Sequence, residues 1–197
     1  MDNDITPIRL TTSAGDATFA TKANTLSASV TAVDTTIPLT SSTGFPASGR
    51  IKIDSEIITY AAVSSNDLIG CVRGLNNTAA AAHSSGASVG CATITVSDTG
   101  HGALVNDFVT FSGAASLGGL VTAAVLNQEY QITDIVNDNT YQIEVREVAT
   151  IGDITTTNGL EPTYVFSNTS DSSNGGGSVI AAYQINTGLD TTITGTG

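Results

Sequence analysis

Short runs of β-branched and other apolar residues recur along the chain, separated by clusters of Gly, Asn, Asp and Ser. Alternating apolar and polar positions are typical of half-buried strands, and clusters of this composition are typical of turns. No segment keeps the 3.6-residue period of an amphipathic helix over a useful length. The pattern predicts an all-β protein of small sandwich-like or barrel-like modules, with long loops and at most a short helical turn.

Residues 24–89 contain one clear hairpin pattern. Ile51 and Ile53 alternate with two basic residues, and Asp54-Ser55 then provides a tight reversal. An apolar run follows, so we expect a hairpin over residues 50–63. The other elements expected here are strands at 35–39 and 68–72, a turn at 42–46 and an irregular loop or one or two helical turns at 76–85.

Residues 90–197 hold the strongest hairpin signal of the chain. The runs 129–136 and 140–148 flank Asn137-Asp138-Asn139, and Asn and Asp tolerate the positive φ that short reversals need. The alternation in the first run is only half clean, since Asp134 falls on the same side as Tyr130 and Ile132. The other elements expected here are strands at 91–96, 107–111, 164–166 and 179–185, a helical turn at 121–127, and loops at 112–120, 155–159 and 171–178.

Composition and charge exclude several classes of partner. The chain has 197 residues, 40% of them hydrophobic but only 5% aromatic, so its core must be mostly aliphatic. Eighteen acidic and six basic residues give a net charge of −12, which argues against binding to nucleic acid or to anionic membrane surfaces. No apolar run approaches the roughly 18 residues of a membrane span, and no secretory signal is visible.

Two parts of the sequence resemble small β modules of tailed-bacteriophage virion and tail structural proteins. The first likeness is carried by Thr36-Ile37-Pro38-Leu39, Gly44-Phe45-Pro46, Gly49, Ile51, Ile53, Glu56-Ile57-Ile58-Thr59-Tyr60, Gly70-Cys71-Val72-Arg73-Gly74, His83, Gly86 and Val89. The second is carried by Ile94-Thr95-Val96, Asp98-Thr99-Gly100-His101-Gly102, Asp107-Phe108-Val109-Thr110-Phe111, Leu126-Asn127, Tyr130-Gln131-Ile132, Gly175-Gly176-Gly177-Ser178-Val179, Ala182-Tyr183-Gln184-Ile185-Asn186 and Gly188-Leu189-Asp190.

The resemblance implies an organisation and a function. In the second family, a segment similar to 8–20 usually runs directly into the strand at 94–96, whereas some seventy residues intervene here. We therefore expect a discontinuous β domain of residues 1–23 plus 90–197 and a small inserted β module of residues 24–89. The resemblance implies a non-enzymatic virion protein without a cofactor. We expect it to form homo-oligomers and contact other virion proteins in the tail, adaptor, fibre or baseplate region.

Two alternatives keep this interpretation open. One is a capsid decoration or head-fibre protein, which differs only in its place on the particle. The other is a receptor-binding or glycan-binding module for a host-surface glycan, for which Tyr60 and Tyr164 are the candidate aromatic contacts.

Candidate catalytic residues are few, and each has a simpler structural interpretation. Gly86-Ala87-Ser88-Val89-Gly90 fits the G-x-S-x-G pattern, but that nucleophile needs a strand before the serine and a helix after it, and the expected order here is reversed. His101 has Asp98 and Asp107 nearby in the sequence, which could orient it as a base, although capping of backbone groups in a turn is favoured.

Metal and disulfide sites are also not favoured. His83, His101, Cys71 and Cys91 lack zinc-ligand spacing, and buried thiols are expected rather than a Cys71–Cys91 disulfide. The loop carboxylates lack an EF-hand pattern and are expected to be solvated; they are Asp98, Asp107, Asp134, Asp138, Asp153 and Asp171. Either Arg9 or Arg73 could pair with a carboxylate of a neighbouring subunit, but Arg73 is at least as well placed to pair with Glu56 or Asp54.

Overall fold

The computed structural model describes residues 8–12, 16–147, 163–173 and 178–186, and its described part is all-β. The elements are β1 (Ile8–Thr12), β2 (Thr18–Thr21), β3 (Ala23–Thr25), β4 (Thr36–Pro38), β5 (Gly49–Ile53), β6 (Glu56–Tyr60), β7 (Ala62–Ser64), β8 (Asp67–Ile69), β9 (Val72–Leu75), β10 (Ser88–Cys91), β11 (Thr93–Ser97), β12 (Phe108–Ser112), α1 (Ala123–Leu126), β13 (Glu129–Asn137), β14 (Thr140–Glu144), β15 (Asp171–Ser173) and β16 (Ile180–Asn186). The predicted fold class is confirmed.

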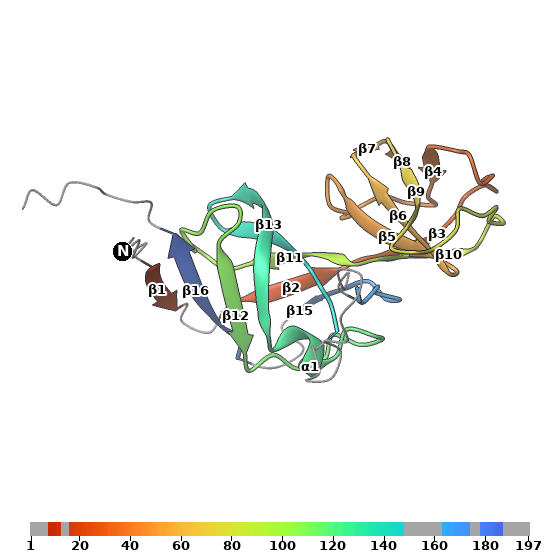
Figure 1. Cartoon of the computed structure of the whole chain (residues 1–197). Coiled ribbons are helices and arrows are strands. Elements are labelled where there is room, and N and C mark those ends of the chain that lie inside the picture. Colours follow the sequence, from red (N-terminus) through yellow and green to blue (C-terminus); the bar gives the residue numbers. More distant parts are fainter. Residues whose placement is uncertain (1–7, 13–15, 148–162, 174–177, 187–197) are drawn as a thin grey trace, which may run out of the picture.

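The larger module is one antiparallel sheet that curves around an apolar core (Figure 1). Its eight strands follow the order β1-β16-β12-β13-β14-β11-β2-β15. The nine-residue β13 pairs with β12 through its first half and with β14 through its second half, so it joins the two halves of the sheet. Phe19, Phe111 and Tyr130 are fully buried in the core between these halves.

The smaller module consists of a five-stranded sheet, β3-β10-β5-β6-β9, and a three-stranded sheet, β4-β8-β7. A bridge between Leu26 and Leu39 links the two sheets, so together they wrap around a second core of mostly aliphatic side chains, which also holds Tyr60 and both cysteines. Ile37, Ile51 and Ile58 are fully buried at its centre. Most of this core is aliphatic, as the low aromatic content predicts.

A two-stranded ribbon runs without interruption from one module into the other (Figure 1). On one side, only Lys22 separates β2 from β3, and on the other only Ala92 separates β10 from β11. β2 pairs with β11, and β3 pairs with β10, so the same two chain segments pair in both modules. The strand pairing and the two separate cores change over from one module to the other near residues 23 and 91. The expected division into two domains stays a prediction.

Both predicted hairpins are present. β5 and β6 reverse at Asp54, whose φ of 52° is the left-handed conformation expected in a tight turn. β13 and β14 reverse at residues 137–139. Gly70, with a φ of 66°, breaks the strand expected at 68–72 into the end of β8 and the start of β9.

Other predictions need correction. The segment 164–166 forms a single bridge between Tyr164 and Arg146 rather than a strand. The sequence pattern did not indicate the short strands β1, β2, β3 and β10. The expectation of a loop over 171–178 is wrong for its first three residues, which form β15 by pairing with β2. The expected turn at 155–159 lies outside the described residues, as do Asp153 and the tail after residue 186. Among the described residues, no helix is long and apolar enough to span a membrane.

Candidate functional site

Glu56, the first residue of β6, is a fully buried carboxylate at the centre of a polar cluster in the smaller module. Arg73 Nε and Nη2 lie 2.7 Å from Glu56 Oε1 and Oε2, so the guanidinium holds the carboxylate with two parallel hydrogen bonds. The backbone N–H groups of Gly74 and Ala81 also donate to this carboxylate, each at 3.0 Å. These donors come from β9 and from the loop that precedes β10.

A β-bulge brings Arg73 into this position. β9 pairs with β6 through Leu75 and Val72, and the register shifts between these pairs, at Arg73 and Gly74. Gly74 has a φ of 66°, and a bulge with a left-handed glycine re-aims the neighbouring side chain. Arg73 then donates to the carbonyls of Thr31 and Ala81 as well, so it ties β9 to two loops.

His83 extends the cluster toward solvent. Its Nε2 lies 2.8 Å from Glu56 Oε2, and its Nδ1 lies 2.8 Å from Asp54 Oδ2. Each ring nitrogen of His83 therefore faces one carboxylate oxygen. His83 also exchanges two backbone hydrogen bonds with Val30, so the loop before β10 is fixed at both its backbone and its side chain.

The environment of Glu56 keeps it ionised. Burial alone would raise the pKa of this carboxyl, but the hydrogen bonds from Arg73, His83 and the Ala81 N–H outweigh burial and lower the pKa from 4.5 to about 2. A carboxylate so strongly held is a poor proton acceptor near neutral pH. The arrangement fits a fixed structural contact better than a general base.

A second buried polar cluster lies in the larger module, around Asp98. The Tyr183 hydroxyl donates to Asp98 Oδ2, and the Tyr141 and Tyr183 hydroxyls are 3.1 Å apart. Asp98 Oδ1 is the one buried side-chain polar atom among the described residues without a hydrogen-bond partner. Burial and the adjacent carboxyl group of Asp16 raise the pKa of Asp98, against the lowering effect of the Tyr183 hydrogen bond. Two carboxyl groups can share a hydrogen bond only when one is protonated, which accounts for the atom without a partner.

His101 caps backbone groups, as the simpler interpretation predicts. Its Nδ1 accepts from the Ala103 N–H at 3.1 Å, and its Nε2 lies 3.2 Å from the Asn137 carbonyl. Because Nδ1 accepts, the proton belongs on Nε2, and both ring nitrogens are then occupied. Asp107 instead accepts from the Leu104 N–H at 2.8 Å. No hydrogen bond between His101 and either aspartate is present among the described residues, so the geometry does not orient His101 as a base.

Ser88 does not stand on a nucleophile elbow. It is the first residue of β10, where it pairs with Thr25, and a strand follows it instead of a helix. Both thiols are free and buried in the core of the smaller module, and burial raises the pKa of Cys71 to about 11 and that of Cys91 to about 12. Within the described ranges, no group of three or more Cys, His, Asp or Glu side chains is placed to hold a metal ion.

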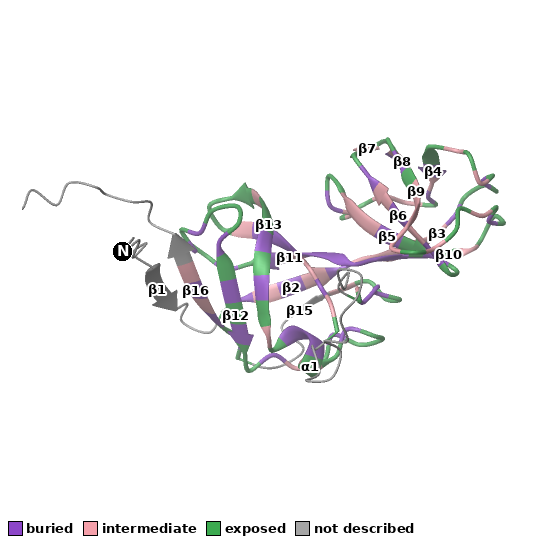
Figure 2. Ribbon diagram, in the orientation of Figure 1, coloured by how far each residue is buried: buried purple, intermediate pink, exposed green. Residues whose placement is uncertain are grey.

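Residues 163–171, which we call the strap, cross the ribbon where the two modules meet. The Val165 N–H donates to the Val145 carbonyl, and the Ser167 N–H donates to the Cys91 carbonyl at 3.0 Å. Further along, Ser170 Oγ accepts from the Ala23 N–H and donates to the Ala23 carbonyl. The strap thus binds both chain segments of the ribbon, and the residues of β10 and β11 beneath it are largely buried (Figure 2).

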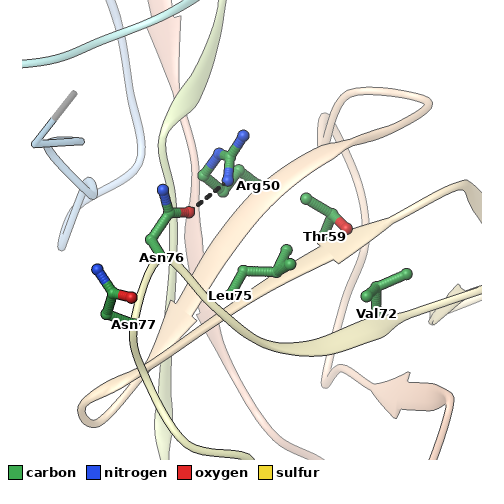
Figure 3. Close-up of a pocket in the computed structure, with 6 residues that line it drawn as sticks. All are labelled: Arg50, Thr59, Val72, Leu75, Asn76 and Asn77. Atoms are coloured by element: carbon green, nitrogen blue, oxygen red, sulfur yellow. Dashed lines mark hydrogen bonds between the residues drawn. The ribbon is translucent and has the colours of Figure 1, made fainter. Parts of the chain in front are cut away.

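Arg50 connects the smaller module to the larger one beside the strap. Its guanidinium carbon lies 4.1 Å from the centre of the Tyr164 ring, and its Nε lies 3.4 Å from Glu144 Oε1. Its Nη1 donates to Asn76 Oδ1 at 2.7 Å (Figure 3). With these three contacts, the side chain is held in one position.

A hollow of about 570 Å³, which we call the β9 hollow, lies on the outer face of the smaller module (Figure 3). It is lined by Arg50, Thr59, Val72, Leu75, Asn76 and Asn77. The first three are cross-strand neighbours on β5, β6 and β9, and the others come from the end of β9 and the turn that follows. Tyr60 is buried and donates to the Pro46 carbonyl, so it cannot be the exposed aromatic contact that the glycan-binding alternative assigned to it.

Comparison with known proteins adds no relative: no family model, no curated protein and no solved structure matches the chain.

Some of these polar contacts could be predicted from the sequence, and others could not. It left two intrachain partners and a neighbouring subunit open for Arg73, and in the structure Arg73 pairs with Glu56, one of the two intrachain candidates. It did not connect His83 to Glu56, because the two residues are 27 positions apart and only the fold brings them together. The β9 hollow was also missed, since its residues are ordinary strand and turn residues. The side chain of Arg9 lies outside the described part of the structure.

Proposed function

We propose that this protein is a non-enzymatic structural subunit of a tailed-bacteriophage particle. It works as a homo-oligomer in the tail, adaptor, fibre or baseplate region. The observation that carries the proposal is how its buried ionisable side chains are used. Glu56, Arg73 and His83 bond to one another and to backbone groups, and His101 caps a loop. Such contacts shape a scaffold and leave these groups unavailable for catalysis.

The outer face of β12 and β16 supports assembly with neighbouring subunits. Phe108 and Ile180 are 36% and 43% exposed on adjacent strands of this face. The residues between them that alternate outward are also uncharged; they are Thr110, Ser112, Ala182 and Gln184. β12 and β16 carry no charge on this face, although the exposed Glu129 of β13 reaches it by accepting a hydrogen bond from Gln184. A largely uncharged face on a protein of net charge −12 fits a surface that another subunit covers.

Mass in solution tests the proposal. We expect native mass spectrometry and light scattering of the full chain to give a multiple of the 19.9 kDa subunit. Three copies favour a fibre or a capsid decoration, and six or twelve favour the tail axis. Phe108→Asp should lower the mass if the β12–β16 face is the contact, while Val33→Asp, at an exposed site on the smaller module, should leave it unchanged. A monomer at every concentration, together with turnover of a small molecule, would overturn the proposal.

A further inference from the structure

The β9 hollow combines aliphatic side chains with several polar groups that have no hydrogen-bond partner among the described residues. We propose that it is a saccharide-binding site, which accepts one hydroxyl-rich ring against β9. The inference goes beyond the structural role proposed above and does not depend on it, since a scaffold can carry such a site whatever its place in a particle.

Three hydrogen-bonding groups around the hollow are open. Arg50 uses Nε and Nη1 within the chain, but its Nη2 has no partner among the described residues. The Thr59 hydroxyl and the Asn77 side-chain amide also make no hydrogen bond to any described residue. Guanidinium and amide groups offer donors and acceptors in planar pairs, and a hydroxyl can donate or accept, so together they can bind the neighbouring hydroxyls of a sugar ring.

The aliphatic side chains of the hollow are suited to the apolar C–H face of a sugar ring. Leu75 lies between the asparagines and Thr59, and Val72, 55% exposed, lies beyond Thr59 at the other end of the hollow (Figure 3). The C–H face of a pyranose ring is apolar, while its rim carries hydroxyls. A hollow with apolar lining and a few converging polar groups is the usual form of a small-ligand site, and about 570 Å³ lies within the usual range of such sites.

The polar groups are held in place without a ligand. Glu144, Tyr164 and Asn76 fix Arg50, as described above. Asn76 and Asn77 have φ values of 52° and 61°, and the Thr78 N–H closes their turn by donating to the Leu75 carbonyl. Since the turn is already formed, little ordering cost remains for binding.

The charge of the hollow narrows the class of saccharide. Among the described residues that line the hollow, only Arg50 is charged. The nearby Glu144 carboxylate is paired with this arginine. A neutral sugar and a sugar that carries a carboxylate, such as a uronic acid, both fit this lining, and a strongly cationic ligand does not.

Backbone amide NMR of the ¹⁵N-labelled full chain tests the site. One titration uses a neutral oligosaccharide, and a second uses an oligosaccharide of uronic acids. Thr59→Val removes a hydroxyl with little change in shape, and Asn77→Gly removes the amide while keeping a residue that accepts a positive φ. Thr36→Val is the matched control, an exposed strand threonine on the three-stranded sheet of the smaller module.

We expect one of the two saccharides to move the resonances of residues 59, 72 and 75–77. Each hollow variant should weaken binding roughly five- to tenfold, the size expected for one lost hydrogen bond, and the control should bind as the parent does. Binding of the uronic acid alone would assign the carboxylate to Arg50. Three outcomes would overturn the proposal: no shift with either saccharide, unchanged binding by both hollow variants, or a particle image with a protein segment filling the hollow.

Discussion

Arg73 and Glu56 form a two-pronged ion pair in which both carboxylate oxygens lie 2.7 Å from guanidinium nitrogens. The Glu56 side chain is fully buried and that of Arg73 is 7% exposed, so this pair is shielded from water and salt. Removal of Arg73 would leave the buried Glu56 carboxylate without its charged two-point donor, with only His83 and two backbone N–H groups as partners, which is more costly than loss of an exposed ion pair.

The first prediction concerns this ion pair. Arg73→Met should lower the free energy of unfolding by about 3–5 kcal/mol, because it removes the charged partner of the buried Glu56 carboxylate. Arg146→Met is the matched control; it loses a stacking contact with Tyr130 and an exposed hydrogen bond to the Glu129 carbonyl, and should cost about 1 kcal/mol or less. Urea unfolding measures both changes. Equal costs in the two variants would show that the pair does not stabilise the smaller module.

The second prediction is the acid sensitivity of the same cluster. The pKa of Glu56 is lowered on folding, from 4.5 to about 2, so its contribution is fully present above pH 4.5 and is lost as the pH falls toward 2. A shift of this size corresponds to about 3 kcal/mol at most. Unfolding measured between pH 5 and pH 2 should show this loss in the parent, and Glu56→Gln should flatten the slope. An unchanged slope in Glu56→Gln would contradict the assignment.

The third prediction concerns Asp98, whose contribution to stability changes with pH in the opposite direction to that of Glu56. The pKa of Asp98 is raised on folding, so its protonated form stabilises the fold at low pH, and this contribution is lost as the pH rises from 3.8 through the raised value. Asp98→Asn supplies a permanent amide donor next to Asp16 and an acceptor for Tyr183. We expect it to stabilise the protein by about 1 kcal/mol at neutral pH. Thermal unfolding of both proteins across this pH range measures the effect, and a destabilised Asp98→Asn variant would refute it.

The fourth prediction concerns the strap. A Cβ atom on Gly90 would lie 2.3 Å from the Ser167 carbonyl oxygen, so Gly90→Ala must displace the strap from the ribbon. Hydrogen exchange at the Ser167 amide, which donates to Cys91, should become much faster. Gly86→Ala is the comparison: its Cβ meets nothing within 4 Å and its cost comes from a φ of 85° alone. If exchange at Ser167 is the same in both variants, the strap does not depend on this close approach.

Local sequence patterns predicted the elements that are regular. The hairpin reversal at Asp54 and the alternation of Ile51 and Ile53 match β5 and β6 because both depend on neighbouring residues only. The half-clean alternation near residue 134 also has a local cause. A register shift between Ile132 and Asp134 changes which side of β13 faces the core, so Ile132 is buried, Asp134 is exposed and Ile135 packs against the core.

Features that depend on contacts between distant segments could not be read from the sequence. β10 and β15 are strands only because they pair with β3, β5 and β2, and their own residues carry little strand signal. Likewise, the cluster around Glu56 needs the bulge at Gly74 and the loop that carries His83. A glycine and a histidine have too many local uses to indicate such an arrangement.

The proposed role as a shared structural subunit is tested most directly by an electron cryo-microscopy reconstruction of the assembled particle. The account predicts several symmetry-related copies of this chain, with Phe108 and Ile180 covered by a neighbouring subunit. A reconstruction in which the chain is missing, or in which single copies stand apart with this face open to solvent, would contradict it.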